Sequence, residues 1–288
     1  MFRPWRIRPY STNLDTAQVT SKIEGPGWYG PRSERFLRKC NYECYNLTTV
    51  DVFLPNRALG IMKYEPHVFA NNCRLCSIFQ GKDGASGVDT PWLTNDAYAA
   101  LISIGALVPG WTLLSPHSHA HNMLAAYSDP LFWEFTEVAE RHVRQRYGRV
   151  TVFEHGPNEV DSLTGCGTGH AHMHMVPLPF SLETEALCFD PAHSWAPCSA
   201  SEIERRVGGR EYLFVSDKFE GSTTRGMLCV LQEPTSQFFR QVVAKALGKG
   251  EFFDYKRYPM LNIVAESSQG LSADAQAVVA ESVTQTVG

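Results

Sequence analysis

The alternation of apolar and polar positions predicts a hairpin followed by a helix in the middle of the chain. Two apolar runs, at 98–107 and 111–114, are separated by Pro109-Gly110, which is typical of a β-hairpin. From 131 to 147 the apolar residues recur at helical intervals, and Gly148 closes the segment. This part of the chain therefore combines antiparallel strands with one amphipathic helix.

Two further strands are expected directly after that helix, at 149–154 and 170–176, and a glycine-rich loop joins them. The order hairpin, helix, strand, loop, strand suits an antiparallel sheet with a helix packed on one face. The sequence thus predicts an α+β fold, in which an antiparallel sheet carries packed helices.

The two ends of the chain differ from this middle part. Residues 1–35 contain Gly-Pro pairs and predict an irregular arm, whereas 45–54 have the composition of a strand. We therefore expect a main domain at 36–180 and a C-terminal α/β extension at 181–288 that packs on it. The extension begins with a connection at 181–200. Three elements are then expected, namely strands at 212–215 and 227–231 and a helix at 236–247.

Histidine alternates with apolar residues at 170–174, which reads His-Ala-His-Met-His. Neighbouring side chains of a strand point to opposite faces, so the three imidazoles would share one face. A single histidine there would more often be structural. Three in register, preceded by glycines at 165, 167 and 169 that let backbone N–H groups approach an anion, indicate a functional site.

The histidine run resembles the H-x-H-x-H-x-x signature of the histidine-triad superfamily. Upstream, residues 110–119 read Gly-Trp-Thr-Leu-Leu-Ser-Pro-His-Ser-His and resemble the family's G-H-T-L-V-I-P-K-x-H segment. The resemblance spans about residues 73–179 and implies the histidine-triad fold. Members act as nucleotidyl hydrolases, phosphorylases or transferases on phosphoanhydride, phosphoramidate or phosphodiester bonds, commonly as dimers. Gly165-Cys166 also resembles the galactose-1-phosphate uridylyltransferase branch, which usually has glutamine in place of His174.

The resemblance implies that His172 is a nucleophile that forms a covalent nucleotidyl-histidine intermediate. Neutral imidazole is a good nucleophile near pH 7 when a hydrogen bond at one ring nitrogen leaves the other nitrogen free. His174 would then contact a phosphate oxygen or assist the leaving group.

The loop before the histidines would bind the phosphate. The amides of Gly167, Thr168 and Gly169 are expected to stabilise developing negative charge. Two positions depart from the family pattern. Gly167 stands where many relatives have serine, with Thr168 as the alternative hydroxyl, and His155-Gly156 stands where the family often has Asn-Gly, which makes His155 a candidate phosphate contact.

Cys73 and Cys76 have the spacing of two thiolates on one zinc ion, a spacing that a redox pair shares. The resemblance to zinc-containing histidine-triad proteins implies that His119 and His170 complete a Cys₂His₂ set. Four protein ligands leave no open coordination position, so the zinc would be structural. Because His117 and His119 alternate, spacing leaves the third ligand open; the segment match favours His119, with His117 as the reserve.

Gln237 and Arg240 lie three apart near the start of the expected C-terminal helix and so share one of its faces. They belong either to a solvated polar surface or to a substrate-phosphate site, in their own subunit or in a neighbouring one.

Composition narrows the partners of the chain. A net charge of -4 over 288 residues provides no basic surface for a nucleic-acid polymer. No apolar run approaches the ~20 residues that span a bilayer. Eight cysteines without a signal peptide indicate a reducing, cytoplasmic setting. We expect a nucleotide or another phosphorylated small molecule as partner, and a homodimer.

Three functions fit these observations. The leading one is a nucleotidyl hydrolase or transferase of the histidine-triad type. A tailoring enzyme for an unusual phosphorylated small molecule, or a dinucleoside polyphosphate phosphorylase, would keep the same site. A non-catalytic nucleotide-binding module belongs to another class, and the intact triad argues against it.

Overall fold

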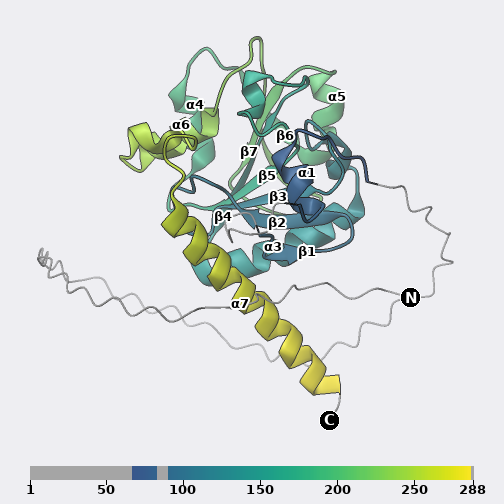
Figure 1. The fold of residues 1–288 in the computed structure, drawn as a ribbon. Helices are drawn as coiled ribbons and strands as arrows, with labels where there is room; N and C mark the ends of the chain where they lie inside the picture. Colours follow the sequence, from purple (N-terminus) through teal and green to yellow (C-terminus); the bar gives the residue numbers. More distant parts are fainter. Residues whose placement is uncertain (1–66, 83–89, 287–288) are drawn as a thin grey trace, which may run out of the picture. The chain divides into compact units, whose positions relative to one another are not determined.

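An antiparallel sheet of eight strands forms the centre of the described part of the chain, residues 67–82 and 90–286 of a computed structural model (Figure 1). The predicted arm at 1–35 and the predicted strand at 45–54 lie outside the described residues. The strands are β1 (Leu93–Thr94), β2 (Tyr98–Ile102), β3 (Thr112–Pro116), β4 (Val150–Gly156), β5 (Met173–Pro177), β6 (Trp195–Ser199), β7 (Tyr212–Ser216) and β8 (Arg225–Val230). Their order is β1-β2-β3-β5-β4-β7-β8-β6, which places the histidine strand near the middle.

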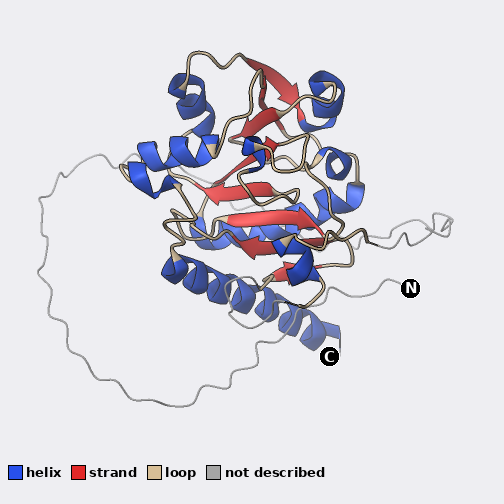
Figure 2. Ribbon diagram, turned by 45° about the horizontal axis from the view of Figure 1, so that its top comes forward, coloured by secondary structure: helices blue, strands red, loops and turns tan. Residues whose placement is uncertain are grey.

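The helices pack on this sheet, which confirms the predicted α+β class (Figure 2). They are α1 (Arg74–Phe79), α2 (Leu124–Tyr127), α3 (Pro130–Tyr147), α4 (Leu182–Phe189), α5 (Ile203–Val207), α6 (Phe238–Ala246) and α7 (Leu261–Thr286), with short 3₁₀ turns at Leu163–Gly165, Ala200–Glu202 and Gly250–Phe253. Among the described helices, none is both long enough and apolar enough to cross a membrane.

The predicted hairpin and the predicted helix after it are both confirmed. β2 pairs with β3, with Ala100 opposite Leu114. The turn requires glycine at 110, because φ is 81° and a Cβ there would lie 2.4 Å from the Tyr147 ring of α3. Helix α3 begins after Asp129, whose side chain accepts a hydrogen bond from the Leu131 N–H at 2.9 Å.

Helices cover both faces of the sheet around β4 and β5. Helix α3 contacts β2, β4 and β5, and α7, drawn in yellow in Figure 1, packs against α3 and β2. The opposite face meets α6, because the ring centroids of Phe153 on β4 and Phe239 on α6 are 4.8 Å apart. The histidine side chains described below lie on this second face, beside Phe153.

The connection predicted at 181–200 is wrong, because it contains helix α4 and strand β6. The Ser181 side chain caps α4 by accepting a hydrogen bond from the Thr184 N–H at 3.1 Å, and Leu182 and Ala186 are buried. Pro197 lacks an N–H but is tolerated in β6, because this strand lies at the edge of the sheet.

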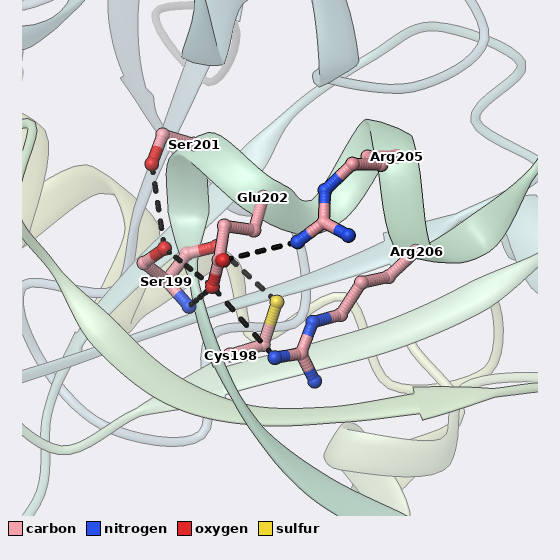
Figure 3. Close-up of polar contacts among 6 residues, drawn as sticks. All are labelled: Cys198, Ser199, Ser201, Glu202, Arg205 and Arg206. Carbon is pink, nitrogen blue, oxygen red and sulfur yellow. Dashed lines mark hydrogen bonds and ion pairs between the residues drawn. The ribbon is translucent and has the colours of Figure 1, made fainter.

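Strand β6 ends in a polar cluster that starts the next helical turn (Figure 3). The Ser199 hydroxyl donates to the Glu202 carboxylate at 3.0 Å, and the two residues form a capping box. Arg205 and Arg206 pair with the same carboxylate at 3.1 and 3.8 Å. All of these side chains belong to one short segment, residues 199–206, and their contacts cap the helical turn that begins there.

Candidate active site and metal cluster

His172 directly precedes strand β5. One of its ring nitrogens makes a hydrogen bond, and the other has no partner among the described residues. Its Nδ1 lies 2.7 Å from the backbone oxygen of His170, so the proton sits on Nδ1 and the lone pair on Nε2. Burial lowers the pKa of His172, and the nearby charge of Arg74 adds to the effect. The imidazole is therefore neutral near pH 7 and carries a nucleophilic nitrogen.

His174 has the opposite tautomer. Its Nδ1 accepts a hydrogen bond from the indole N–H of Trp111 at 2.8 Å, so its proton is on Nε2. The ring stacks on Phe153 with centroids 4.4 Å apart, and its centroid is 4.8 Å from that of His172. Burial lowers the pKa of His174 well below its ordinary value. A neutral N–H donor therefore sits beside the candidate nucleophile.

Hydrogen bonds from β3 and the segment after it fix the chain at 170–172, ahead of the ladder of β5. The Ala171 N–H donates to the Ala120 oxygen at 2.7 Å, and the Ser115 hydroxyl donates to the Ala171 oxygen at 2.8 Å. This part was predicted to belong to the strand, but the strand itself starts at Met173. The backbone bends at His170, whose side chain belongs to a separate cluster, and the strand begins after this bend.

The four predicted metal ligands come together. The ligand atoms of Cys73, Cys76, His119 and His170 all lie within 4.8 Å of one another. The sulfur of Cys73 is 3.3 Å from Nδ1 of His170, and that of Cys76 is 3.4 Å from Nδ1 of His119. Tetrahedral zinc with ordinary bond lengths separates sulfur from nitrogen by about 3.6 Å. The donor set therefore fits a metal ion that is soft enough for thiolate and imidazole.

Two surrounding contacts support this assignment. The Nε2 of His170 lies 2.9 Å from the Pro116 oxygen, so the proton sits there and Nδ1 is free to bind a cation. His117, the reserve ligand, is elsewhere. Its Nε2 lies 3.2 Å from the Thr94 hydroxyl, and its ring packs against Phe79. Four protein donors would fill a tetrahedral ion, which leaves it no position for substrate.

Glu154 stabilises the segment that carries His119, and its side chain lies on the face of β4 opposite to the histidines. Its carboxyl is fully buried and accepts hydrogen bonds from the Met123 N–H at 2.7 Å and from the Tyr127 and Tyr212 hydroxyls at 2.6 and 2.7 Å. Met123 follows His119 by four positions, so the carboxyl anchors the segment that carries this ligand. Burial raises the pKa of Glu154 to about 7, against the lowering effect of these three hydrogen bonds.

The glycine-rich loop is only partly arranged as predicted. Gly167 and Gly169 have φ values of 76° and 59°, which favour glycine. The Thr168 N–H donates to the Gly165 oxygen at 3.1 Å, so this amide is already used within the loop. The Thr168 side chain and Cys166 line the same pocket as His172 and His174. The Thr168 amide is therefore not free for an anion, and neither Gly167 nor Gly169 is among the residues that line this pocket.

The C-terminal residues predicted to contact phosphate are buried rather than part of a solvated surface. Arg240 is 3% exposed and lines the His172 pocket of its own chain. Gln237 is 8% exposed, and its N–H donates to the sulfur of Cys166 at 3.2 Å. His155, on β4, also lines the pocket, with its ring centroid 5.9 Å from that of His174.

Residues that shape the pocket escaped the sequence analysis. Trp111 is not among its lining residues, but it sets the tautomer of His174. The Tyr255 hydroxyl donates to the Cys166 oxygen at 2.8 Å, and Cys166 itself reaches the pocket. The position of Tyr255 could not be found from sequence, because it depends on how the segment after α6 folds back.

The comparisons with known proteins add little to this geometry. No protein-family model matches the chain, and no curated protein matches it. Among solved structures, it is similar to a Hit-like protein involved in cell-cycle regulation from Bartonella henselae, crystallised with an unknown ligand. The two are 18% identical, and the match covers 38% of this chain and 82% of that chain at a TM-score of 0.29.

Proposed function

We propose that this protein is a nucleotidyl hydrolase or transferase of the histidine-triad type that uses His172 as its nucleophile. The proposal rests above all on the paired tautomers of His172 and His174, which place a free lone pair beside an N–H donor. A binding module would need neither arrangement.

The reaction follows from these two imidazoles. Nε2 of His172 attacks phosphorus and forms a P–N bond while the bond from phosphorus to the leaving group breaks. The Nε2–H of His174 hydrogen-bonds to an oxygen of the transferring group or to the departing atom. Water or another acceptor then attacks phosphorus, the P–N bond breaks, and the electron pair returns to His172.

We propose zinc for the Cys₂His₂ cluster, where it would hold the chain in place. Cys73 and Cys76 come from the segment that begins α1, His119 follows β3, and His170 precedes β5. One ion would therefore bind three separate segments two residues away from the nucleophile. The ion supplies attachment, and the imidazoles supply the chemistry.

The test is an intact-mass measurement after incubation with labelled nucleotides, which should reveal an adduct on His172. His172→Asn is the informative variant, because the Asn amide can still donate to the His170 oxygen but offers no nucleophilic nitrogen. We expect turnover to fall by roughly 10³-fold or more. The control His193→Asn changes a histidine paired with Asp190 outside the pocket and should keep full activity. Unchanged turnover in His172→Asn would exclude covalent catalysis by this residue.

A substrate panel separates the remaining activities. Dinucleoside polyphosphates, nucleoside phosphoramidates and nucleotide sugars, each with and without inorganic phosphate, distinguish hydrolase, phosphorylase and transferase. The panel also includes phosphorylated compounds without a nucleoside, and turnover of these alone would identify the tailoring enzyme instead.

A further inference from the structure

A buried positive charge lies in the wall of the His172 pocket. Among the described residues no carboxylate forms an ion pair with it, although the charge of Asp254 is near enough to raise its pKa. The Arg240 guanidinium donates from Nε to the Phe253 oxygen at 2.8 Å and from Nη2 to the Gly105 oxygen. Its Cζ lies 4.9 Å from the ring centroid of Trp111, so the planar group rests on the indole. Burial lowers the pKa of Arg240 to about 10, and it stays protonated at neutral pH.

These contacts hold Arg240 in place but do not balance its charge. Within residues 67–82 and 90–286, no ion pair involves this guanidinium, and its two hydrogen bonds use two of its five N–H groups. A buried charge is costly unless an opposite charge accompanies it. A guanidinium left in this state is suited to an anion from outside the chain.

His155 offers an unpaired donor in the same pocket. Its Nε2 accepts a hydrogen bond from the Phe239 N–H at 3.1 Å, so the neutral ring carries its proton on Nδ1. This Nδ1 is buried and has no hydrogen-bond partner among the described residues, and the side chain is only 5% exposed. Burial lowers the pKa of His155 to about 3, which keeps the ring neutral. A buried N–H without an acceptor is itself unfavourable.

Both groups line the pocket that His172 and His174 also line. The His174 ring centroid lies 5.9 Å from that of His155 and 4.8 Å from that of His172. Arg240 follows Phe239, whose N–H donates to His155, and the Arg240 charge is near enough to help lower the pKa of His155. A charged fork and a neutral donor together match the oxygens of a phosphate or a carboxylate.

We propose that Arg240 and His155 form a second anion subsite in the His172 pocket. The substrate then carries a further phosphate or carboxylate group beyond the phosphorus that His172 attacks. This inference rests on the proposed function for the identity of the first site, but the subsite is defined by its own residues.

Binding measurements without turnover test it. Calorimetric titration of the metal-loaded protein compares methylphosphonate, which has one anionic group, with methylenebisphosphonate and phosphonoacetate, which have two. We expect both double anions to bind at least ~10-fold more tightly than methylphosphonate, as one charge-assisted hydrogen bond allows. The tighter of the two identifies phosphate or carboxylate as the natural group. Metal content is measured before and after, so that chelation is recognised.

Two variants at one position separate the subsite from its structural role. In His155→Gln the amide can still accept from the Phe239 N–H, but the Nδ1 donor is lost. This variant should keep its melting temperature and lose the ~10-fold preference for double anions. His155→Asn keeps a donor near Nδ1 and loses the helix contact, so it should melt lower and retain the preference. Arg240→Lys, which keeps the charge without the planar fork, should also weaken the double anions.

Wild-type affinity for both double anions in His155→Gln and Arg240→Lys would overturn the subsite, whatever His172 does. If His172→Asn stays active while His155→Gln loses the preference for double anions, the subsite is supported and the proposed chemistry of His172 is wrong. The two proposals therefore fail separately.

Discussion

Two sides of the His172 pocket are attached to the fold in different ways. On one side, four side chains that fit a single metal ion meet at His170, two residues before His172. On the other, α6 and the segment after it attach by separate hydrogen bonds through Arg240, Tyr255 and His155. A single ion would make the first attachment all-or-none, whereas the second attachment is distributed over several hydrogen bonds, so single losses there should have graded effects.

The largest effect is expected on the metal side. Cys76→Ser removes a thiolate from a buried cluster, and we expect the chain to lose its bound metal. The free energy of unfolding should fall by roughly 5 kcal/mol or more, because binding and folding are linked. Metal analysis and urea denaturation measure both. The control Cys188→Ser alters an exposed cysteine outside the cluster and should change neither. Full metal retention in Cys76→Ser would contradict the assignment.

A second prediction concerns Glu154, whose buried carboxyl anchors the segment that carries His119. Its pKa is about 7 in the folded protein and 4.5 when unperturbed, so the folded state binds the proton more tightly. Unfolding then releases a proton between these pH values, and the free energy of unfolding should fall as pH rises from about 4.5 to 7. The expected contribution is roughly 3 kcal/mol.

Glu154→Gln should remove this part of the pH dependence. Denaturation of both proteins across this range isolates it, because the histidines that also titrate are common to the two. Equal slopes would show that Glu154 does not take up a proton in the folded state.

The smallest effect is expected at the glycine loop, residues 165–169, which faces the segment after α6. Gly167→Ala and Gly169→Ala both place a side chain in the left-handed region, at a cost of about 1 kcal/mol each. Only at Gly167 would the new Cβ meet a neighbour, the Lys256 Nζ at 2.7 Å. The lysine can move, so denaturation should give similar stabilities. The Lys256 charge acts on Cys166, which lines the pocket, so moving it should raise KM for an anionic substrate only in Gly167→Ala. Equal KM values would show that the position of Lys256 does not matter.

The same contrast explains what the sequence could predict. The hairpin and helix α3 were predictable, because their signals are a turn and a helical periodicity. In the cluster, short spacing indicated only Cys73 and Cys76, whereas His119 and His170 were implied by the resemblance to a known family. Helix α4 and strand β6 were missed, because Pro191 and Pro197 suggested an irregular connection. Pro197 nevertheless lies within β6, where the edge of the sheet tolerates a proline. Helix α7 was not predicted at all.

The positions of individual side chains in the pocket depended still more on tertiary structure. Nothing local indicates that Arg240 rests on Trp111, or that the indole N–H of Trp111 fixes the tautomer of His174. These contacts join segments more than sixty positions apart. A motif identifies the residues that react, whereas the environment that sets their protonation comes from the fold.

His170 serves the site with two parts of one residue, its imidazole in the cluster and its backbone oxygen on His172. A bound ion would thus act as a mechanical tether that reaches His172 through the His170 oxygen, which bonds Nδ1 rather than the proposed attacking nitrogen, Nε2. Its Lewis acidity would be irrelevant to the rate. Stripping the ion with a chelator should slow the enzyme, whereas exchanging it for cobalt or cadmium in the same tetrahedral sphere should leave kcat unchanged.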